Sequence, residues 1–256
     1  MKKSEIAQNI FNILNDFDDY LKYGFKTKRE KKDFSFWDIE ENEIKNEIKE
    51  NSKIVIENKN NQASSNKSKK EMVELGFEIL KCERCILGAI CKKKIPGVGE
   101  IPADIFVISG YLTIENEKNN HPLTQNELEL FNKWLDSIKI DRKKIFITSI
   151  LKCLHYNKKI EREYIEQCRY YLDRQIEIVN PFLIITLGDI ALSSLKKEKR
   201  ENKNFHGESF TYNNRIVFTT YHPKDMLKDY QLRKDIWADL QKIRDFLQKE
   251  KPSIFL

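Results

Sequence analysis

Four short runs of almost unbroken apolar residues stand out from residue 103 onward. They read ADIFVISG at 103–110, KIFITSIL at 144–151, FLIITLG at 182–188 and RIVFTTYHP at 215–223. Runs of this length without polar alternation are typical of strands that are covered on both faces of a sheet. The pattern therefore predicts four buried β-strands.

Stretches with helical periodicity lie between these runs and after the last one. Apolar side chains recur three and four residues apart over 125–138, 161–179 and 232–248, and a shorter helix is expected over 189–197. Strands that alternate with helices predict an α/β domain with a largely parallel sheet. In open sheets of this kind, ligands bind at the edge formed by the carboxyl ends of the strands. The residues at or near these ends are Gly110, Ser149, Gly188 and His222.

The first 70 residues follow another pattern. Apolar side chains at helical spacing over 4–23 predict an N-terminal helical extension, which we bound at 1–38. Residues 39–70 are charged, rich in Asn and Ser and poor in large apolar groups, which predicts a disordered linker. For the first part of this linker, 39–50, a solvated helix is an alternative.

Length and charge narrow the class of protein. A chain of 256 residues can build one sizeable core with an appendage, so we expect a globular domain over 71–250 and a short tail over 251–256. The net charge of +6, from 46 basic and 40 acidic side chains, is weak support for a polyanionic partner. The sequence shows no secretory signal and no apolar run of the ~20 residues that span a bilayer. We therefore expect a cytoplasmic protein whose thiols stay reduced.

Three of the five cysteines fall within the segment KCERCILGAIC. Cys82 and Cys85 form a C-x2-C pair, while Cys153 follows a predicted strand and Cys168 lies on the apolar face of a predicted helix. Four thiolates suit a structural zinc or an iron–sulfur cluster, and the lack of a second C-x2-C favours the cluster. Cys168 also fits an ordinary core position. Cys91 is either a spare thiol or a replacement for one of the four.

Taken together, these elements resemble the family 4 uracil-DNA glycosylases, the iron–sulfur branch of the uracil-DNA glycosylase superfamily. The resemblance covers about 72–248 and depends on the C-x2-C pair and on ITSILKC, NPFLIITLG, TYHPKDML and KDIWADL. It implies a three-layer α/β/α fold with a four-stranded, mainly parallel sheet. It also implies a monomer that hydrolyses the N-glycosidic bond of uracil, or of a related damaged base, in DNA. The ligands it implies for a 4Fe–4S cluster are Cys82, Cys85, Cys153 and Cys168.

The resemblance also assigns roles at the sheet edge. His222, in TYHP, matches the family histidine that faces the O2 atom of the base. A histidine after a strand is otherwise an ordinary surface or hydrogen-bonded residue, and the loop after it is otherwise an ordinary polar loop. The residues of that loop, which contacts DNA in the family, are Pro223, Lys224, Met226, Leu227 and Lys228.

The remaining pocket positions depart from the family pattern. The first-strand motif G-E-x-P-G becomes ISGYLTIENE, so Gly110 stands for the family glycine and Tyr111 follows it. The positioning of water falls to Glu115 or Glu117, unless both carboxylates are simply solvated. The stacking phenylalanine of the family is Leu123 here, which has no aromatic face. The asparagine that reads the base is Ser149, whose hydroxyl cannot supply the paired donor and acceptor of an amide.

These departures leave three functional readings open. The first is a glycosylase with an altered or relaxed base preference, because a site loses selectivity when it loses the group that pairs with one edge of its substrate. The second is a DNA-binding relative that no longer cleaves. The third is a zinc-stabilised α/β protein that does not act on DNA.

Overall fold

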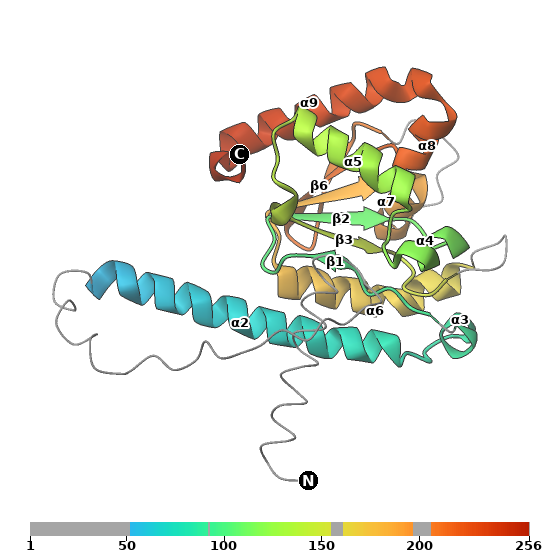
Figure 1. The fold of residues 1–256 in the computed structure, drawn as a ribbon, viewed down its shortest axis with the longest axis horizontal. Helices are drawn as coiled ribbons and strands as arrows, with labels where there is room; N and C mark the ends of the chain where they lie inside the picture. The colour runs from blue at the N-terminus through green and yellow to red at the C-terminus, as the bar shows by residue number, and fades with distance from the viewer. Residues whose placement is uncertain (1–51, 92, 155–160, 197–205, 256) are drawn as a thin grey trace, which may run out of the picture.

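The computed structural model describes residues 52–91, 93–154, 161–196 and 206–255 (Figure 1). The predicted N-terminal extension and the first part of the predicted linker lie outside these residues. At the centre is a six-stranded sheet in the order β1-β3-β2-β4-β6-β5. Among the helices of the described segments, none is both long and apolar enough to cross a membrane.

Four parallel strands form the middle of the sheet and coincide with the four predicted runs. Val107 pairs with Ile147 on one side and with Ile185 on the other, which fixes the register of the central three strands. Every residue of these three strands is buried, as the unbroken apolar runs predict. The four strands are β2 (Ile105–Ser109), β3 (Ile145–Ser149), β4 (Leu183–Leu187) and β6 (Arg215–Thr220).

Two further strands lie at the edges of the sheet and are not predicted by the apolar pattern. β1 (Val98–Gly99) runs antiparallel to β3, and β5 (Ser209–Tyr212) runs antiparallel to β6. β1 has only two residues, and β5 alternates between exposed and half-buried positions, so neither produces an apolar run. The fold therefore has the predicted parallel centre with two short antiparallel edges.

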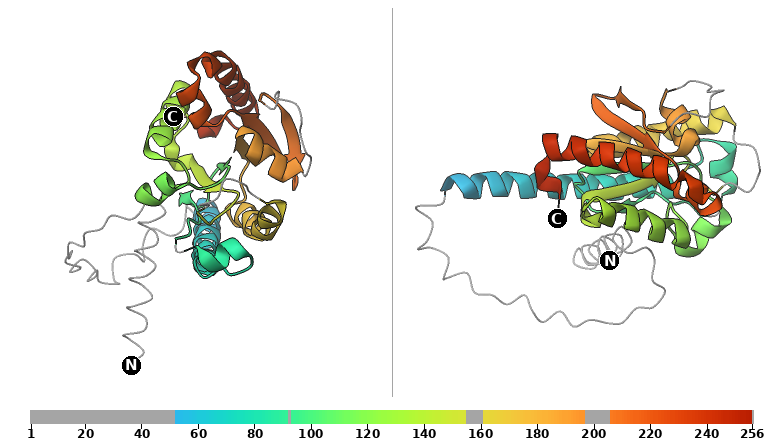
Figure 2. Two further views of the ribbon diagram at one scale, coloured as in Figure 1. Left: turned by 90° about the vertical axis from the view of Figure 1, so that its right-hand side faces the viewer. Right: turned by 90° about the horizontal axis from the view of Figure 1, so that it is seen from above.

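Helices cover both faces of the sheet and complete three layers, which confirms the predicted fold class (Figure 2). One face is covered by α6 (Arg162–Val179) and α7 (Gly188–Lys196), and the other by α5 (Gln125–Ser137) and α9 (Arg233–Glu250). Alternate strand residues point to opposite faces. The even-numbered residues of β2 thus join the core under α6 and α7, and Ile105 joins the core under α5 and α9.

A long helix, α2 (Ser52–Leu80), packs along α6 on the outside of that layer (Figure 1). Met72, Leu75 and Ile79 of α2 are fully buried. Residues 52–70 are predicted as linker but are helical, so the disordered prediction does not hold for them. Extending an existing helix adds one hydrogen bond per residue fixed, so the docked C-terminal half can propagate into a polar sequence.

Short helices complete the described chain, and the predicted tail belongs to the domain. Ile254 is fully buried in the core under α9, and Phe255 forms a bridge with Ile140. The α-helical elements among these are α3 (Ile86–Ile90), α4 (Ile114–Asn119) and α8 (Pro223–Lys228). The 3₁₀ turns are η1 (Arg142–Lys144), η2 (Tyr230–Leu232) and η3 (Pro252–Ile254).

Candidate active site and metal centre

His222 stands between β6 and α8, at the carboxyl edge of the sheet. It is the N-cap of α8, and its ring Nδ1 accepts a hydrogen bond from the backbone N–H of Lys224 at 3.2 Å. Asp225 completes a capping box, since its carboxylate accepts from the backbone N–H of His222 at 3.2 Å. Pro223 occupies the first turn, where its missing N–H costs nothing. The TYHPKD segment therefore fixes the position of the imidazole through local structure.

Gly188 makes room for the His222 side chain. It follows β4, the strand between β2 and β6, and has a φ of +84°, which favours glycine. A Cβ at this position would lie 3.3 Å from the Cβ of His222. The last glycine of NPFLIITLG thus lets the histidine side chain pack directly against the end of the central strand.

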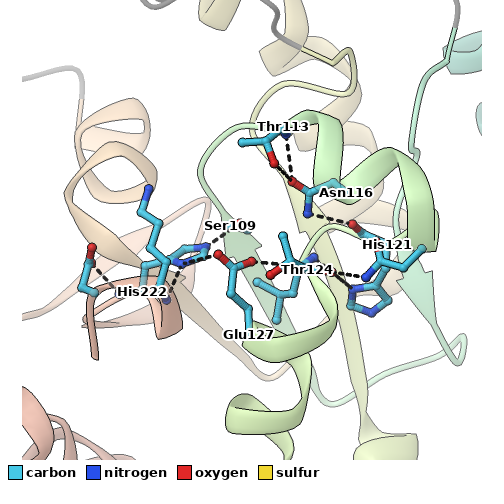
Figure 3. A network of polar contacts seen from close by, with 11 residues as sticks. Ser109, Thr113, Asn116, His121, Thr124, Glu127 and His222 are labelled. Carbon is cyan, nitrogen blue, oxygen red and sulfur yellow. Dashed lines mark hydrogen bonds and ion pairs between the residues drawn. The ribbon is translucent and has the colours of Figure 1, made fainter. Parts of the chain in front are cut away.

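His222 reaches Ser109 at the end of β2, with 3.0 Å between the ring Nε2 and the serine Oγ (Figure 3). Both residues are buried. Because Nδ1 accepts a backbone hydrogen bond, the proton of a neutral ring resides on Nε2 and is donated to Ser109. Burial, with a further contribution from Lys224, lowers the pKa of His222 to about 3. The ring is therefore a neutral N–H donor at physiological pH.

Glu127 lies on the other side of the imidazole, 3.8 Å from Nδ1 (Figure 3). Its second oxygen accepts from the backbone N–H of Thr124 at 2.8 Å, in the capping box of α5. Serine, histidine and carboxylate resemble a hydrolase triad, but the proton directions differ. A triad histidine donates from Nδ1 to the carboxylate and accepts from the serine, whereas here Nδ1 is an acceptor and Nε2 a donor. The arrangement suits stabilisation of negative charge rather than activation of Ser109.

The segment that follows β2 is held by its own polar contacts (Figure 3). Asn116 accepts from the backbone N–H of Thr113 at 2.8 Å and donates to the carbonyl of His121 at 3.0 Å. The ring of His121 accepts from the backbone N–H of Leu123 at 2.9 Å. Burial lowers the pKa of His121 to about 3. These contacts shape the part of the chain in which the resemblance expects the base pocket.

The pH dependence of the unfolding free energy should reveal that His121 and His222 are buried in their neutral forms. With folded-state pKa values near 3, His121 and His222 bind protons mainly in the unfolded state, where the pKa is about 6.5. Their contribution to the stability of the folded protein is therefore fully present above pH 6.5 and is lost as the pH falls towards 3. At pH 5 each histidine should cost about 2 kcal/mol of unfolding free energy. Urea titrations at pH 7 and pH 5 should show a smaller loss for His121→Gln than for the wild type, and equal losses would contradict the prediction.

The structure gives each predicted pocket residue a distinct environment. Leu123 is fully buried in the core under α5 and has no free face for a base. The Ser149 hydroxyl donates to the carbonyl of Leu151 at 2.7 Å. Gly110 is buried at the end of β2, and Tyr111 is half-buried with the Lys224 ammonium 5.2 Å from its ring centre. Glu115 is exposed in the first turn of α4.

The loop that the resemblance assigns to DNA forms α8, next to His222. Pro223 is buried, and Lys224 and Met226 are half-buried. Leu227 has 53% of its surface exposed, and Lys228 is exposed as well. The end of α8 thus presents one large apolar side chain and one cation to solvent beside the buried imidazole.

Ser109 and Glu127 were not predicted from the sequence as partners of the imidazole. Ser109 is a polar residue at the end of an apolar run, and T-Q-N-E over 124–127 is a capping-box pattern. Each signal was present, but neither indicates which side chain lies opposite. The contact between Ser109 and His222 joins positions 113 residues apart and depends on the strand order.

Four of the cysteines line one cavity that is partly open to solvent. Cys82 follows α2, Cys85 precedes α3, Cys153 follows β3 and Cys168 lies within α6. The fold therefore gathers the four predicted ligands from three separate parts of the chain. The backbone N–H of Arg84 donates to the sulfur of Cys82 at 3.5 Å, and that of Lys152 to the sulfur of Cys168 at 3.4 Å. Such N–H···S bonds stabilise thiolate ligands.

The donor set is that of an iron–sulfur cluster, because four cysteines from three parts of the chain line the cavity and two of their sulfurs accept backbone N–H groups. Among the described residues, no three His, Cys, Asp or Glu side chains lie close enough together to hold a single metal ion. Burial raises the pKa of Cys168, so a bound cation is needed to keep its thiolate there. The donor set and the cavity together fit an iron–sulfur cluster.

Cys91 is not part of the cavity lining. Its sulfur donates to the carbonyl of Lys93 at 2.8 Å and accepts from the backbone N–H of Leu154 at 3.2 Å. It also hydrogen-bonds the Cys153 side chain. Cys91 therefore supports the segment that carries a predicted ligand.

Comparison with known proteins agrees with this fold. The family model of the uracil-DNA glycosylase superfamily matches residues 96–241, more than half of the chain. A type-4 uracil-DNA glycosylase of Sulfurisphaera tokodaii is 32% identical over 179 residues, which cover 66% of this chain and 81% of that protein. The type-4 enzyme of Saccharolobus solfataricus is 33% identical, covering 68% and 85%. That of Archaeoglobus fulgidus is 27% identical, covering 70% and 94%.

The chain therefore belongs to the uracil-DNA glycosylase superfamily, and within it to the type-4 family. The resemblance drawn from the sequence is thereby confirmed. Membership sets aside the reading of an unrelated zinc-stabilised α/β protein.

Proposed function

We propose that this protein is a DNA-repair glycosylase that hydrolyses the N-glycosidic bond of uracil, or of a related damaged base, in DNA. The observation that carries the proposal is the buried, neutral Nε2–H of His222 at the carboxyl edge of the sheet. Family membership and the names of the type-4 relatives support the same reaction.

The chemistry requires a donor of this kind. A base inside the duplex is out of reach, so it must be flipped out of the stack before its bond to the sugar can be cut. As the bond breaks, the leaving base gains negative charge and the sugar becomes cation-like. A preorganised donor in a buried site stabilises such charge without reorganising during the reaction. In the unbound protein Ser109 accepts this hydrogen bond, and a base carbonyl would take the donor from it.

A carboxylate near the site would favour the cation-like sugar. Glu127 is buried and lies 3.8 Å from the His222 ring, whereas Glu115 is exposed. The observed geometry therefore favours Glu127 over Glu115 for this electrostatic role. Positioning of the attacking water by Glu115 stays a prediction of the resemblance.

The residues at the two family positions that recognise the base, Leu123 and Ser149, support a relaxed preference for the base that is excised. With Leu123 fully buried and the Ser149 hydroxyl engaged by Leu151, neither offers the aromatic face or the amide found at these family positions. Tyr111, which follows Gly110 at the end of β2, supplies an aromatic ring at this edge. We assign the flipped base to this edge of the sheet, beside Gly110 and Tyr111.

We assign the DNA contacts to α8. Lys224 and Lys228 would meet backbone phosphates, and the exposed Leu227 would press into the duplex where the base has left. Pro223 and Met226 would hold this helix against the domain.

We further propose that Cys82, Cys85, Cys153 and Cys168 hold a 4Fe–4S cluster. When bound, the cluster supplies a structural cross-link, because its ligands come from the end of α2, the end of β3 and the middle of α6. We also propose that the protein acts as a monomer in the cytoplasm. The five cysteines of the described segments form no disulfide, which suits a reducing compartment.

The direct test is base release from defined oligonucleotides. Purified protein should convert uracil-containing single- or double-stranded DNA into abasic product, which alkali then cleaves, and should leave the same strand with thymine intact. Strands with hypoxanthine or xanthine report a broadened preference. Salt-dependent DNA binding without product from any of these substrates would contradict the enzyme and favour the silent relative.

A further inference from the structure

Lys152 is a lysine with only 1% of its surface exposed, next to the predicted ligand Cys153. Its ammonium donates to the hydroxyl of Thr148 at 2.5 Å and to the carbonyl of Ser149 at 2.6 Å. Its backbone N–H donates to the sulfur of Cys168. The residue also belongs to the lining of the cysteine cavity. It thus joins the end of β3 to the predicted metal centre.

The hydrogen-bond partners of this ammonium are neutral. The Thr148 hydroxyl in turn donates to the carbonyl of Pro96 at 2.8 Å and to the side-chain oxygen of Gln175 at 3.1 Å, both within the interior. None of the ion pairs found among the described residues includes Lys152. A buried charge is costly unless an opposite charge compensates it. The network therefore satisfies the hydrogen bonds of Lys152 but not its charge.

The cysteine cavity can supply the missing negative charge. No Asp or Glu belongs to its described lining, which includes four cysteines and the two cations Arg84 and Lys152. Four thiolate ligands carry more negative charge than the cationic iron–sulfide core of a cluster neutralises, so the filled cavity would be anionic. An anion on one side and an uncompensated ammonium on the other would each lower the cost of burying its neighbour.

We propose that Lys152 is the internal counter-ion of the cluster, and that its charge sets the reduction potential and the retention of that cluster. This inference depends on the cluster assigned above. Cluster potentials respond to net charge and to hydrogen bonds at the sulfurs. Because adding an electron to an anionic cluster is easier beside a cation, removing the ammonium shifts the potential to a more negative value. The same ammonium holds the Ser149 carbonyl, so Lys152 is also a positioning residue for the end of β3.

The test compares Lys152→Met, Lys152→Gln and a matched control, Lys249→Met, whose lysine is 83% exposed on α9. Each full-length protein is assayed for iron content and for the midpoint potential of its cluster, using dithionite and redox mediators as electron source. We expect both Lys152 variants to shift the potential negatively and to lose iron faster to a chelator, and the control to match the wild type. A shift in Lys152→Met alone would assign the effect to the hydrogen bonds, and would overturn the counter-ion role.

The outcomes separate this role from the cluster itself. An iron-free wild type overturns the cluster and the counter-ion together. A wild type that contains iron, with a Lys152→Met protein of equal potential and equal iron retention, overturns only the role of Lys152. If the methionine variant does not fold, the glutamine variant, which keeps a donor for Thr148 and Ser149, decides the question. If a Lys152 variant folds but contains no iron, that loss supports the counter-ion role, because it shows that retention of the cluster depends on Lys152.

Discussion

Replacing His222 by alanine is expected to slow uracil excision by about 10²–10³-fold, the usual cost of removing one preorganised donor to a developing anion. The reason is that the buried Nε2–H has no substitute among the groups that contact the ring, since Ser109 accepts from it and the Glu127 side chain accepts from the backbone N–H of Thr124. Single-turnover rates on a uracil-containing oligonucleotide measure this loss without interference from product release.

Alanine also removes the N-cap of α8, so a second variant separates the two effects. His222→Asn keeps a side chain that caps helices well but withdraws the imidazole. Both variants should lose the same activity while only alanine loses about 1 kcal/mol of stability. His206→Ala is the matched control, because this histidine lies outside the site against Tyr221 and Asp239. Wild-type rates in a folded His222→Asn protein would refute the assignment of the donor.

Replacing Cys168 by serine is expected to give a colourless, iron-poor protein that melts earlier. Its sulfur lies in the middle of α6, where a lost ligand detaches the cluster from the helix that contacts α2. A loss of about 3 kcal/mol would lower the Tm by roughly 6–12 °C for a domain of this size. Visible absorbance, iron and zinc analysis and a thermal melt of each variant measure the effect.

Cys91→Ser provides the matched comparison, since it changes the fifth cysteine outside the cavity lining. A hydroxyl can keep the contacts with Lys93 and Leu154, so this variant should retain iron and colour. Iron retained in Cys168→Ser and lost in Cys91→Ser would reverse the assignment and make Cys91 a ligand. Zinc in place of iron in the wild type would contradict the cluster.

The elements that sequence predicts well here are those whose signal is local. The four apolar runs became β2, β3, β4 and β6. The first three are buried throughout, because a strand covered on both faces tolerates few polar residues, whereas β6 is buried only in part. The helices after them followed from periodicity alone. β1 and β5 were missed because edge strands are short and half-exposed, and their pairing depends on neighbours rather than on composition.

The sequence indicates the cysteines and the histidine of the candidate site, but not the residues that contact the histidine. A cysteine motif and TYHP are recognisable segments, whereas the meeting of Ser109, Glu127 and His222 depends on three separate elements. The linker prediction failed over 52–70 because composition measures what a segment can bury, and not whether a docked helix continues into it. The role of Lys152 was equally hidden, because only the fold reveals that its surroundings lack a carboxylate.

The direction of α2 has a practical consequence. At 29 residues the helix is about 44 Å long, and its first turn points away from the edge where the parallel strands end (Figure 1). A fluorophore, affinity handle or solid support joined at position 52, the start of α2, would therefore lie at the end of the domain opposite that edge. Immobilisation from that side should leave the front free for long nucleic-acid strands to approach.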